Sequence, residues 1–265
     1  NFLISNNMKS KLIILGCGSS VGIPRIDGAW GSCKKNNKKN RRTRCSAIII
    51  KGSNSVLIDT SPDIKSQLLS NKIKNISSVI FTHEHADQTN GLFELRPFFW
   101  KNKRKIDVFG NKKTIKYLTT KQDYLFRKIS SHPPILKANI VKKKFSIGKL
   151  KDKISFQTFD AKHGKTRCVV YVFQNVAYIS DSNDLSIINR SELKNLKLLI
   201  IDCLTLKKHS SHFNLREALF IHRKLNPKKT ILTNLGHKLD YDALKRKLPK
   251  NIFPAYDNLK IDLSV

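Results

Sequence analysis

Long hydrophobic runs, repeats and flexible linkers are all missing from this 265-residue sequence. No apolar stretch approaches the roughly 18 residues that a membrane helix requires, so we expect no association with a membrane. No Gly/Ser-rich or Pro-rich segment divides the chain, and no sequence period recurs. The length therefore predicts one large layered domain over residues 8–265.

Cysteine and methionine are also scarce. The five cysteines are scattered and odd in number, without a close Cys-x-x-Cys pair, which argues against a disulfide framework or a structural zinc knuckle. The N-terminus lacks a basic segment followed by a long apolar one, so no export signal is visible and a cytoplasmic location is expected. The only methionine is Met8, which predicts that residues 1–7 are a non-native or disordered extension.

Acidic residues are few, with 19 Asp and Glu against 51 Lys and Arg, so the formal charge is +32. Such an excess favours a polyanionic partner such as nucleic acid. Most of the excess is Lys, accompanied by many Asn and Ile, a mixture that an AT-rich coding sequence produces without selection for binding. The Lys34–Arg44 segment is richer in Arg, and two interpretations stay open for it. It is either a solvated loop or a phosphate contact made by Arg41, Arg42 and Arg44.

A metal-binding motif follows one short apolar run. Ser78–Thr82 reads as a buried strand, and His83, His85 and Asp87 come directly after it as His-x-His-x-Asp. Two imidazoles two residues apart in an extended loop can converge on one divalent ion. A carboxylate two residues further on can reach a neighbouring ion or orient bound water. Three liganding residues alternating at a strand end predict a metal site.

Apolar runs alternating with helical patterns predict a layered α/β architecture, with the sheet inside and helices outside. The clearest helix is Asn214–Leu225, with Asn214 as N-cap and Glu217 at the third helical position. Loops at strand ends are expected to carry the chemistry. The predicted strands are Lys11–Leu15, Cys45–Ile50, Val56–Asp59, Val79–Thr82, Ile106–Phe109, Ile154–Phe159, Cys168–Phe173, Val176–Ile179, Leu198–Asp202 and Thr230–Thr233, and the other predicted helices are Pro62–Leu69, Lys112–Thr119 and Tyr241–Lys247.

Two further polar residues stand at predicted strand ends. His163 comes after the Ile154–Phe159 strand, and Asp181 comes after the Val176–Ile179 strand. Taken singly, His163 could be a loop histidine and Asp181 a helix N-cap. Together they would complete a set of three imidazoles and one carboxylate around an ion such as Zn²⁺, Mn²⁺ or Fe²⁺, and this joint placement favours the metal site.

These motifs resemble the metallo-β-lactamase superfamily, its branch of PhnP-like phosphodiesterases and, more distantly, tRNase Z. The resemblance implies a four-layer αββα sandwich with metals held at one edge between two sheets. Gly16-x-Gly18 after a strand hints at a dinucleotide fold instead, but Val21 occupies the final glycine position of that motif. The segments that carry the resemblance span most of the chain and are Leu15–Ser20, Leu57–Asp63, His83–Asp87, Asn90-Gly91, Leu95–Pro97, His163-Gly164, Ser180-Asp181, His212–Asn214 and Leu239–Tyr241.

The resemblance also implies a role for each ligand. It assigns His83, His85 and His163 to a first metal, Asp181 to a bridging position and Asp87 to a second metal. The implied reaction is hydrolysis of a phosphodiester through a metal-bound hydroxide, so Asp87 and Asp181 are expected to be catalytic as well.

The chain departs from the family pattern at the second metal. Gln88 stands where the family has the last histidine of its motif, and Asn234 stands where related phosphodiesterases have another second-site histidine. An amide oxygen is a poorer ligand than imidazole for borderline transition metals. We therefore expect one tight site for Zn or Mn, and a second site that is weak, taken by a harder ion, or absent. His237 either substitutes at this site or is solvated.

His212 resembles the family histidine that contacts phosphate or protonates the leaving oxygen, which makes it a third candidate catalytic residue. The alternative is an exposed histidine just before the Asn214 helix. His132, His209 and His222 are interpreted as ordinary histidines, with His222 on a helix face.

Three functions are compatible with these residues. The first is a phosphodiesterase for a small cyclic phosphate or a nucleotide-like ester. The second is a nuclease related to tRNase Z. The positive charge favours this function, but the sequence shows no evident long arm for gripping tRNA. The third is a weakly active or noncatalytic metal-binding relative. The expected partner is a small phosphate ester, with nucleic acid and a second copy of the chain, as a homodimer, left as open alternatives.

Overall fold

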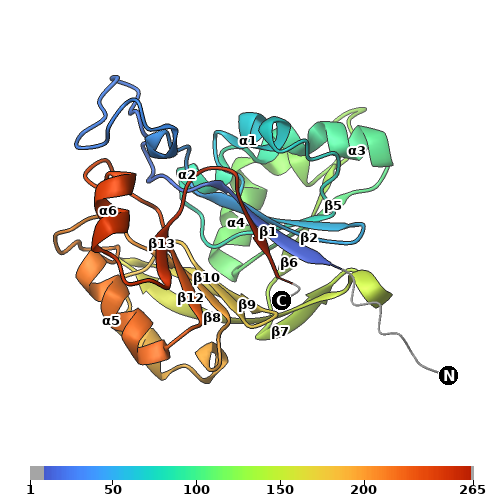
Figure 1. Ribbon diagram of the computed structural model, residues 1–265. Coiled ribbons are helices and arrows are strands. Elements are labelled where there is room, and N and C mark those ends of the chain that lie inside the picture. The colour runs from blue at the N-terminus through green and yellow to red at the C-terminus, as the bar shows by residue number, and fades with distance from the viewer. Residues whose placement is uncertain (1–8, 264–265) are drawn as a thin grey trace.

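Two seven-stranded mixed sheets pack against each other, with helices on their outer surfaces (Figure 1). This computed structural model describes residues 9–263, so the expectation for residues 1–7 lies outside the described range. The arrangement is the four-layer αββα sandwich predicted from the sequence. None of the helices in residues 9–263 has both the length and the apolar character needed to cross a membrane.

The first sheet has the strand order β14-β1-β2-β3-β4-β5-β6. Its first four strands pair antiparallel, and β3 to β6 pair parallel. Its strands are β1 (Ser10–Gly16), β2 (Ser46–Lys51), β3 (Asn54–Ile58), β4 (Ser78–Ile80), β5 (Ile106–Gly110), β6 (Leu136–Ile140) and β14 (Leu259–Asp262).

The second sheet has the order β13-β12-β11-β10-β9-β8-β7. Strands β7 to β10 pair antiparallel, and β10 to β13 pair parallel. Parallel neighbours end at the same edge of a sheet, which gathers the polar residues that follow them. Its strands are β7 (Lys144–Ile147), β8 (Ile154–His163), β9 (Thr166–Phe173), β10 (Val176–Ile179), β11 (Leu198–Asp202), β12 (Lys229–Thr233) and β13 (Ile252–Pro254).

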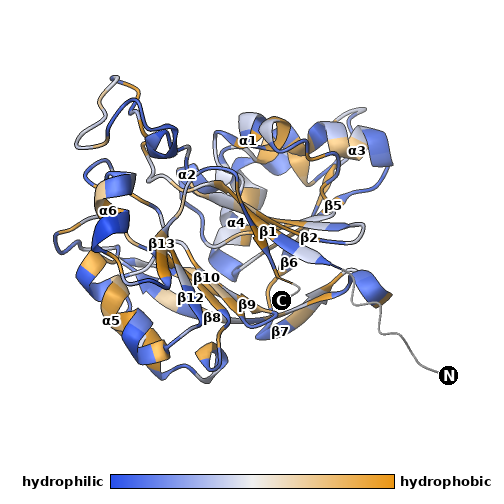
Figure 2. Ribbon diagram, viewed as in Figure 1, coloured by the Kyte–Doolittle hydropathy of each residue, from blue (hydrophilic) through white to orange (hydrophobic). Residues whose placement is uncertain are grey.

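Three layers of apolar side chains hold the four structural layers together. Residues from both sheets, among them Ile49 and Tyr171, form the core between the sheets. The outer face of the first sheet packs on helices through residues such as Ile64, and that of the second sheet through residues such as Ile221. Figure 2 shows the matching pattern, with hydrophobic strands inside and helices that are hydrophilic on one side. Burial of these faces is the main force that fixes the sandwich.

The helices begin where the sequence supplies caps. Asn214 and Glu217 form the predicted capping box, because each side chain accepts a hydrogen bond from the other residue's backbone N–H. The Asn111 side chain accepts a hydrogen bond from the backbone N–H of Thr114 at the start of α4. The helices are α1 (Ile64–Ser70), α2 (Ala86–Thr89), α3 (Arg96–Asn102), α4 (Lys112–Lys121), α5 (Leu215–Leu225) and α6 (Tyr241–Lys247).

Several predicted boundaries are wrong by a few residues. Strand β8 continues past Phe159 to His163, because its pairing with β9 persists as far as the His163–Thr166 pair. Strand β4 ends at Ile80, before the predicted end at Thr82. Helix α1 begins at Ile64, two residues after Pro62. Each error falls where local sequence is compatible with both states and the tertiary pairing decides.

The Lys34–Arg44 segment packs against the start of α6. The Asn40 side chain donates a hydrogen bond to Asp240 over 2.7 Å, and Asn37 donates one to Asp242 over 2.9 Å. The Lys39 ammonium lies 4.6 Å from the ring centroid of Tyr241 and also faces a second ring, that of Tyr256. These contacts fix the segment in place, so it is not simply a solvated loop.

Candidate metal centre

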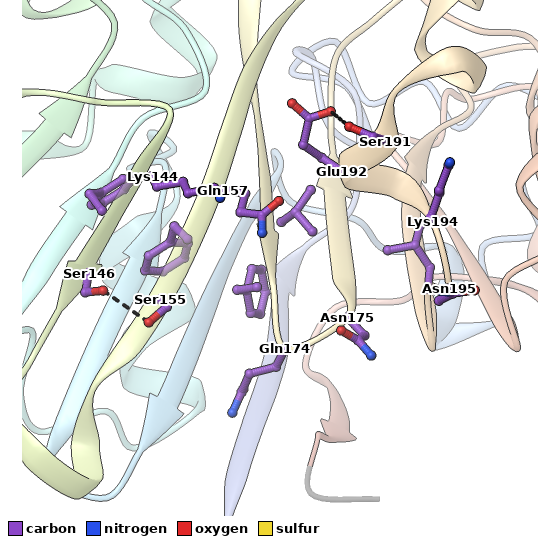
Figure 3. Close-up of a pocket in the computed structure, with 15 residues that line it drawn as sticks. Lys144, Ser146, Ser155, Gln157, Gln174, Asn175, Ser191, Glu192, Lys194 and Asn195 are labelled. Carbon is purple, nitrogen blue, oxygen red and sulfur yellow. Dashed lines mark hydrogen bonds between the residues drawn. The ribbon is translucent and has the colours of Figure 1, made fainter.

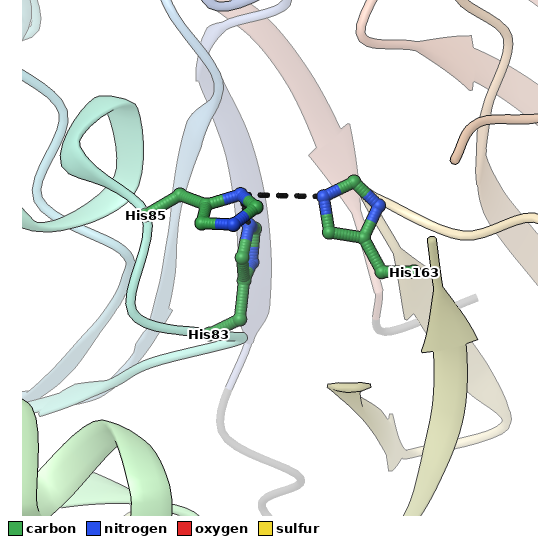
Figure 4. Close-up of side chains that lie close together, drawn as sticks. All are labelled: His83, His85 and His163. Atoms are coloured by element: carbon green, nitrogen blue, oxygen red, sulfur yellow. Dashed lines mark hydrogen bonds between the residues drawn. The ribbon is translucent and has the colours of Figure 1, made fainter. Parts of the chain in front are cut away.

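Four candidate ligands meet where strands of the two sheets end. His83 and His85 follow β4 of the first sheet, while His163 ends β8 and Asp181 follows β10 of the second sheet. The imidazoles therefore approach one another from opposite sheets, as Figure 4 shows for the three histidines. Each of these residues stands at or just after a strand end, where loops and strand termini commonly carry functional groups.

The spacing of the three imidazoles suits a single ion. His83 Nε2 lies 3.0 Å from His85 Nδ1, and His163 Nε2 lies 3.3 Å from the same His85 atom. A tetrahedral ion bound to nitrogen at about 2.0–2.1 Å holds its ligand atoms about 3.3 Å apart. His83 and His163 are buried, whereas His85 is exposed. The residues thus fit a divalent ion held at the mouth of the site.

The protonation states of the ligands agree with metal binding. Burial lowers the pKa of His83 to about 3 and also lowers the pKa of His163, so both rings are neutral at pH 7. Burial alone would raise the pKa of Asp181, but the neighbouring rings of His83 and His212 bring it below its ordinary value. Neutral imidazoles and an ionised carboxylate are the forms that bind a metal.

Amide groups lie against the carboxylates at the expected second metal position. Gln88 Nε2 donates to Asp87 over 3.1 Å and to Asp181 over 3.4 Å. Asn234 Nδ2 donates to the other oxygen of Asp181 over 3.1 Å. Both departures from the family pattern therefore place N–H donors, instead of imidazoles, beside Asp181. Burial and the Asp181 charge raise the pKa of Asp87, which marks it as part of the same cluster.

His237 lies against a different segment. Its backbone oxygen accepts a hydrogen bond from the N–H of Ser32 over 2.9 Å, and its ring borders Gly31. Gly31 has a positive φ of 59° and no room for a side chain there. Among the described residues, the clustered ligand atoms come from His83, His85, His163, His212 and Asp181, not from His237.

A second layer of residues orients the ligands. Thr82 Oγ1 lies 3.0 Å from His83 Nδ1, and Asp59 accepts hydrogen bonds from both the N–H and the hydroxyl of Thr82. His163 Nδ1 donates to the backbone oxygen of Ser211 over 2.8 Å. These bonds leave the Nε2 atoms of both histidines directed at the cluster. Asp59 was not assigned to the site from the sequence, although it directly follows β3 at the same edge.

His212 lies beside the metal cluster and is paired with a buried carboxylate. Its Nδ1 lies 2.8 Å from Asp202 Oδ2, and its ring centroid lies 4.7 Å from that of His163. Burial raises the pKa of Asp202 to about 7. Burial would lower the pKa of His212, but Asp202 and Asp181 raise it to about 9. Near pH 8 the pair is therefore an ion pair with a protonated His212.

Asp202 was missed as a site residue. The sequence does contain the relevant feature, because Asp202 is a carboxylate at the end of a predicted strand. The same feature identified Asp181. His209 was interpreted as an ordinary histidine, yet its ring lies 5.2 Å from that of His212. His222 does lie on a helix, where its Nδ1 lies 2.8 Å from the hydroxyl of Thr230.

The three arginines of the basic segment have different surroundings. Arg41 is exposed and lies over the ring of Trp30, 5.1 Å from its centroid. Arg42 is only 1% exposed and donates to Asn40. Arg44 forms an ion pair with Asp63 over 2.8 Å. Of the three guanidinium groups, only that of Arg41 is both exposed and without an ion-pair partner among the described residues.

A separate groove of about 720 Å³ lies at the opposite end of the second sheet, where β8 begins and β9 ends (Figure 3). Its lining includes Lys144, Gln157, Gln174 and Glu192 but no histidine or cysteine. The groove therefore lacks metal-ligating side chains apart from one carboxylate, and it does not compete with the histidine cluster as a metal centre.

Comparisons with known proteins agree with this geometry. Residues 54–234 match the family model for the beta-lactamase superfamily domain. A crystal structure described as a new diphosphatase from the PhnP family is 30% identical, covers 96% of this chain and 97% of that chain, and superposes with a TM-score of 0.86. The short form of human tRNase Z is 13% identical over 96% of this chain and 99% of its own, with a TM-score of 0.67.

A curated relative has a different name. An octanoyltransferase of Porphyromonas gingivalis (strain ATCC BAA-308 / W83) is 30% identical over 258 residues, which cover 94% of this chain. The chain spans about half the length of that relative, since the match covers 51% of it.

Proposed function

Since the chain belongs to the metallo-β-lactamase superfamily, in its PhnP branch, we propose that it is a phosphodiesterase for small phosphate esters. The observation that carries this proposal is the convergence of His83, His85 and His163 with an ionised Asp181 beside a protonated His212. The first four residues form a ligand set, and the fifth is a proton donor. Hydrolysis of an ester with a poor leaving group is accelerated by both.

The chain's own residues divide the chemistry between them. His83, His85, His163 and Asp181 would hold a divalent ion, with Zn and Mn as the candidates. When bound, such an ion lowers the pKa of water and polarises a phosphoryl oxygen. Asp87 lies beside Asp181 at the same edge, where its carboxylate can accept a hydrogen bond from the attacking water.

His212 is proposed to donate a proton to the leaving oxygen. Its Nδ1–H is directed at Asp202, so Nε2 is the atom available to a substrate. The ring stands next to His163, and therefore next to the proposed ion. His209 is exposed and its ring lies 5.2 Å from that of His212, so it can contact the rest of a phosphate ester. Arg41 is exposed and is the proposed phosphate contact of the basic segment, whereas phosphate binding by Arg42 and Arg44 requires their present contacts to change.

The favoured substrates are small cyclic phosphates and nucleotide-like esters. A diphosphatase of the PhnP family is similar to the chain over its whole length, which supports a small substrate. A tRNase Z-like nuclease is the second candidate, supported by the similar fold and by the charge of +32. The octanoyltransferase is about twice as long as this chain, which matches only 51% of it. We therefore do not transfer that activity to the chain.

Two single substitutions test the proposal. Asp181→Ala and His85→Ala each remove one ligand, so hydrolysis of bis-p-nitrophenyl phosphate and of a cyclic phosphate should fall to background. Circular dichroism should show that both variants remain folded. The matched control is His132→Ala, a histidine in the exposed loop after α4, which should keep the wild-type rate. Activity that survives both ligand substitutions would come from a contaminant and would end the proposal.

A further inference from the structure

One helical segment presents aromatic side chains to solvent. A short 3₁₀ turn, η2 (Leu92–Leu95), continues directly into α3, which contains no buried residue. The side chains of Phe93 and Trp100 are 46% and 58% exposed, and Pro97 between them is exposed too. Pro97 and Trp100 are three positions apart in α3 and so share one side of that helix, and Phe93 precedes them in the 3₁₀ turn. We call Phe93, Pro97 and Trp100 the aromatic stripe.

The core does not explain the exposure of the aromatic stripe. Leu92 and Leu95 are buried under the segment, and Phe98 and Phe99 pack on the same apolar cluster as partly buried residues. The segment is therefore already anchored to the first sheet by these residues, and Trp100 is not among the described residues that pack on this cluster. Exposed apolar groups that are contiguous, and not scattered singly, commonly mark a binding surface.

Basic residues are frequent in the segments of sequence that contain the aromatic stripe and Tyr124. Arg96 lies over the ring of Tyr124, which is itself exposed, at 5.1 Å from the centroid. Residues 93–105 and 121–128 together contain eight basic and two acidic residues, a net charge of +6. One of the two acids, Asp123, is paired with Arg127. A composition rich in Lys, Asn and Ile accounts for the lysines but gives no reason for an exposed tryptophan.

We propose that the aromatic stripe, with Tyr124 and its basic neighbours, binds single-stranded nucleic acid. Unpaired bases stack on exposed aromatic rings, and adjacent Lys and Arg neutralise the backbone phosphates. A second copy of the chain fits this surface poorly, because each copy would bring the same +6 charge to the contact. Charge complementarity therefore selects a polyanion, and the aromatic rings select one that carries bases.

The position of the aromatic stripe relates it to the metal centre. Phe93 follows Asp87 by six residues, and α2 and η2 are the only elements between the histidine motif and α3. The segment leads away from the metal edge along the outer side of the first sheet (Figure 1). A bound strand could thus extend from the site along the segment. The binding itself does not depend on hydrolysis.

The test is the affinity for a dye-labelled oligothymidylate, measured by fluorescence anisotropy with the metal-loaded protein at low salt. Trp100→Ala and Phe93→Ala should each raise the Kd about 5- to 100-fold, in keeping with the loss of one stacked base. Trp100→Phe, which keeps an aromatic face, should restore most of the affinity. Leu150→Ala is the matched control, because Leu150 is 93% exposed and lies between two lysines.

Two further measurements decide between partners. In a Trp30→Phe background Trp100 is the only tryptophan, and oligothymidylate should quench its fluorescence whereas inorganic polyphosphate of equal charge should not. An unchanged Kd for Trp100→Ala would overturn the proposal. So would a dimer that dissociates on this substitution, or binding of Trp100 to anionic lipid vesicles in preference to the oligonucleotide.

Discussion

At the scale of single residues, two histidines of one site have opposite protonation behaviour. Burial lowers the pKa of His83 to about 3, although the charge of Asp181 opposes this shift. His212 also loses solvent, yet Asp202 at 2.8 Å raises its pKa to about 9. The same side chain is therefore suited to metal binding at one position and to proton donation at the other, as its neighbours dictate.

The pairing of His212 with Asp202 leads to a prediction about leaving groups. His212→Ala should keep the metal and lose rate on the order of 10²-fold or more for a phosphodiester with an alkyl leaving group. A p-nitrophenyl leaving group needs little proton donation, so its rate should fall much less. Asp202→Asn should shift the alkaline limb of the rate profile below pH 9, because His212 loses its ion pair. Equal losses for both leaving groups would leave His212 without a role as a proton donor.

Site residues differ in how far the sequence reveals them. His83 and His85 belong to a local motif, and His163 and Asp181 are readable as polar residues at strand ends. Asp202 and Asp59 also stand at strand ends, but each acts through another side chain, and only the folded structure shows that contact. The position of His209 beside His212 depends on the path of a loop, which no local pattern specifies.

At the scale of elements, the strands that the sequence failed to indicate are the four sheet edges. They are β6, β7, β13 and β14, whereas every interior strand was predicted. An interior strand is buried on both faces or nearly so and reads as an apolar run. An edge strand such as β14 has one partner and alternates between half-buried and exposed residues, so its pattern resembles that of a loop.

The basic segment is held by a carboxylate whose ionisation should affect stability. Asp257 accepts hydrogen bonds from the backbone of Cys17 and from both the backbone and the hydroxyl of Thr43. Burial raises the pKa of Asp257 to about 6. The folded protein therefore keeps this proton up to about pH 6, whereas an unfolded chain releases it near pH 4.

The sign of the resulting pH dependence is fixed. Because the folded pKa is the higher one, the contribution of Asp257 to the free energy of unfolding is greatest below about pH 4 and declines until about pH 6. In Asp257→Asn this decline is absent. The stability of wild type relative to the variant, measured by urea denaturation, should fall by about 2 kcal/mol between pH 4 and pH 7. A difference that stays constant over this range would show that Asp257 has an ordinary pKa.

At the scale of the whole molecule, the fold and its metal edge follow from the sequence, but the number of ions does not. The sandwich brings carboxylates and amides from both sheets to one edge, and Gln88 and Asn234 donate to Asp181 there. Whether a second ion binds depends on the balance between these amide donors and a cation. This balance is a property of the assembled edge and not of any one motif.

Elemental analysis of the protein, purified without chelators, measures how many metal ions each chain holds. We predict one tightly held transition metal ion per chain in the wild type, because His83, His85 and His163 group within reach of one ion and Asp181 lies beside His163 as the proposed fourth ligand. Gln88→His should add a ligand and raise the content toward two ions per chain. Near-equal occupancy of two tight sites in the wild type, or no metal at all, would contradict the prediction of one tight ion per chain.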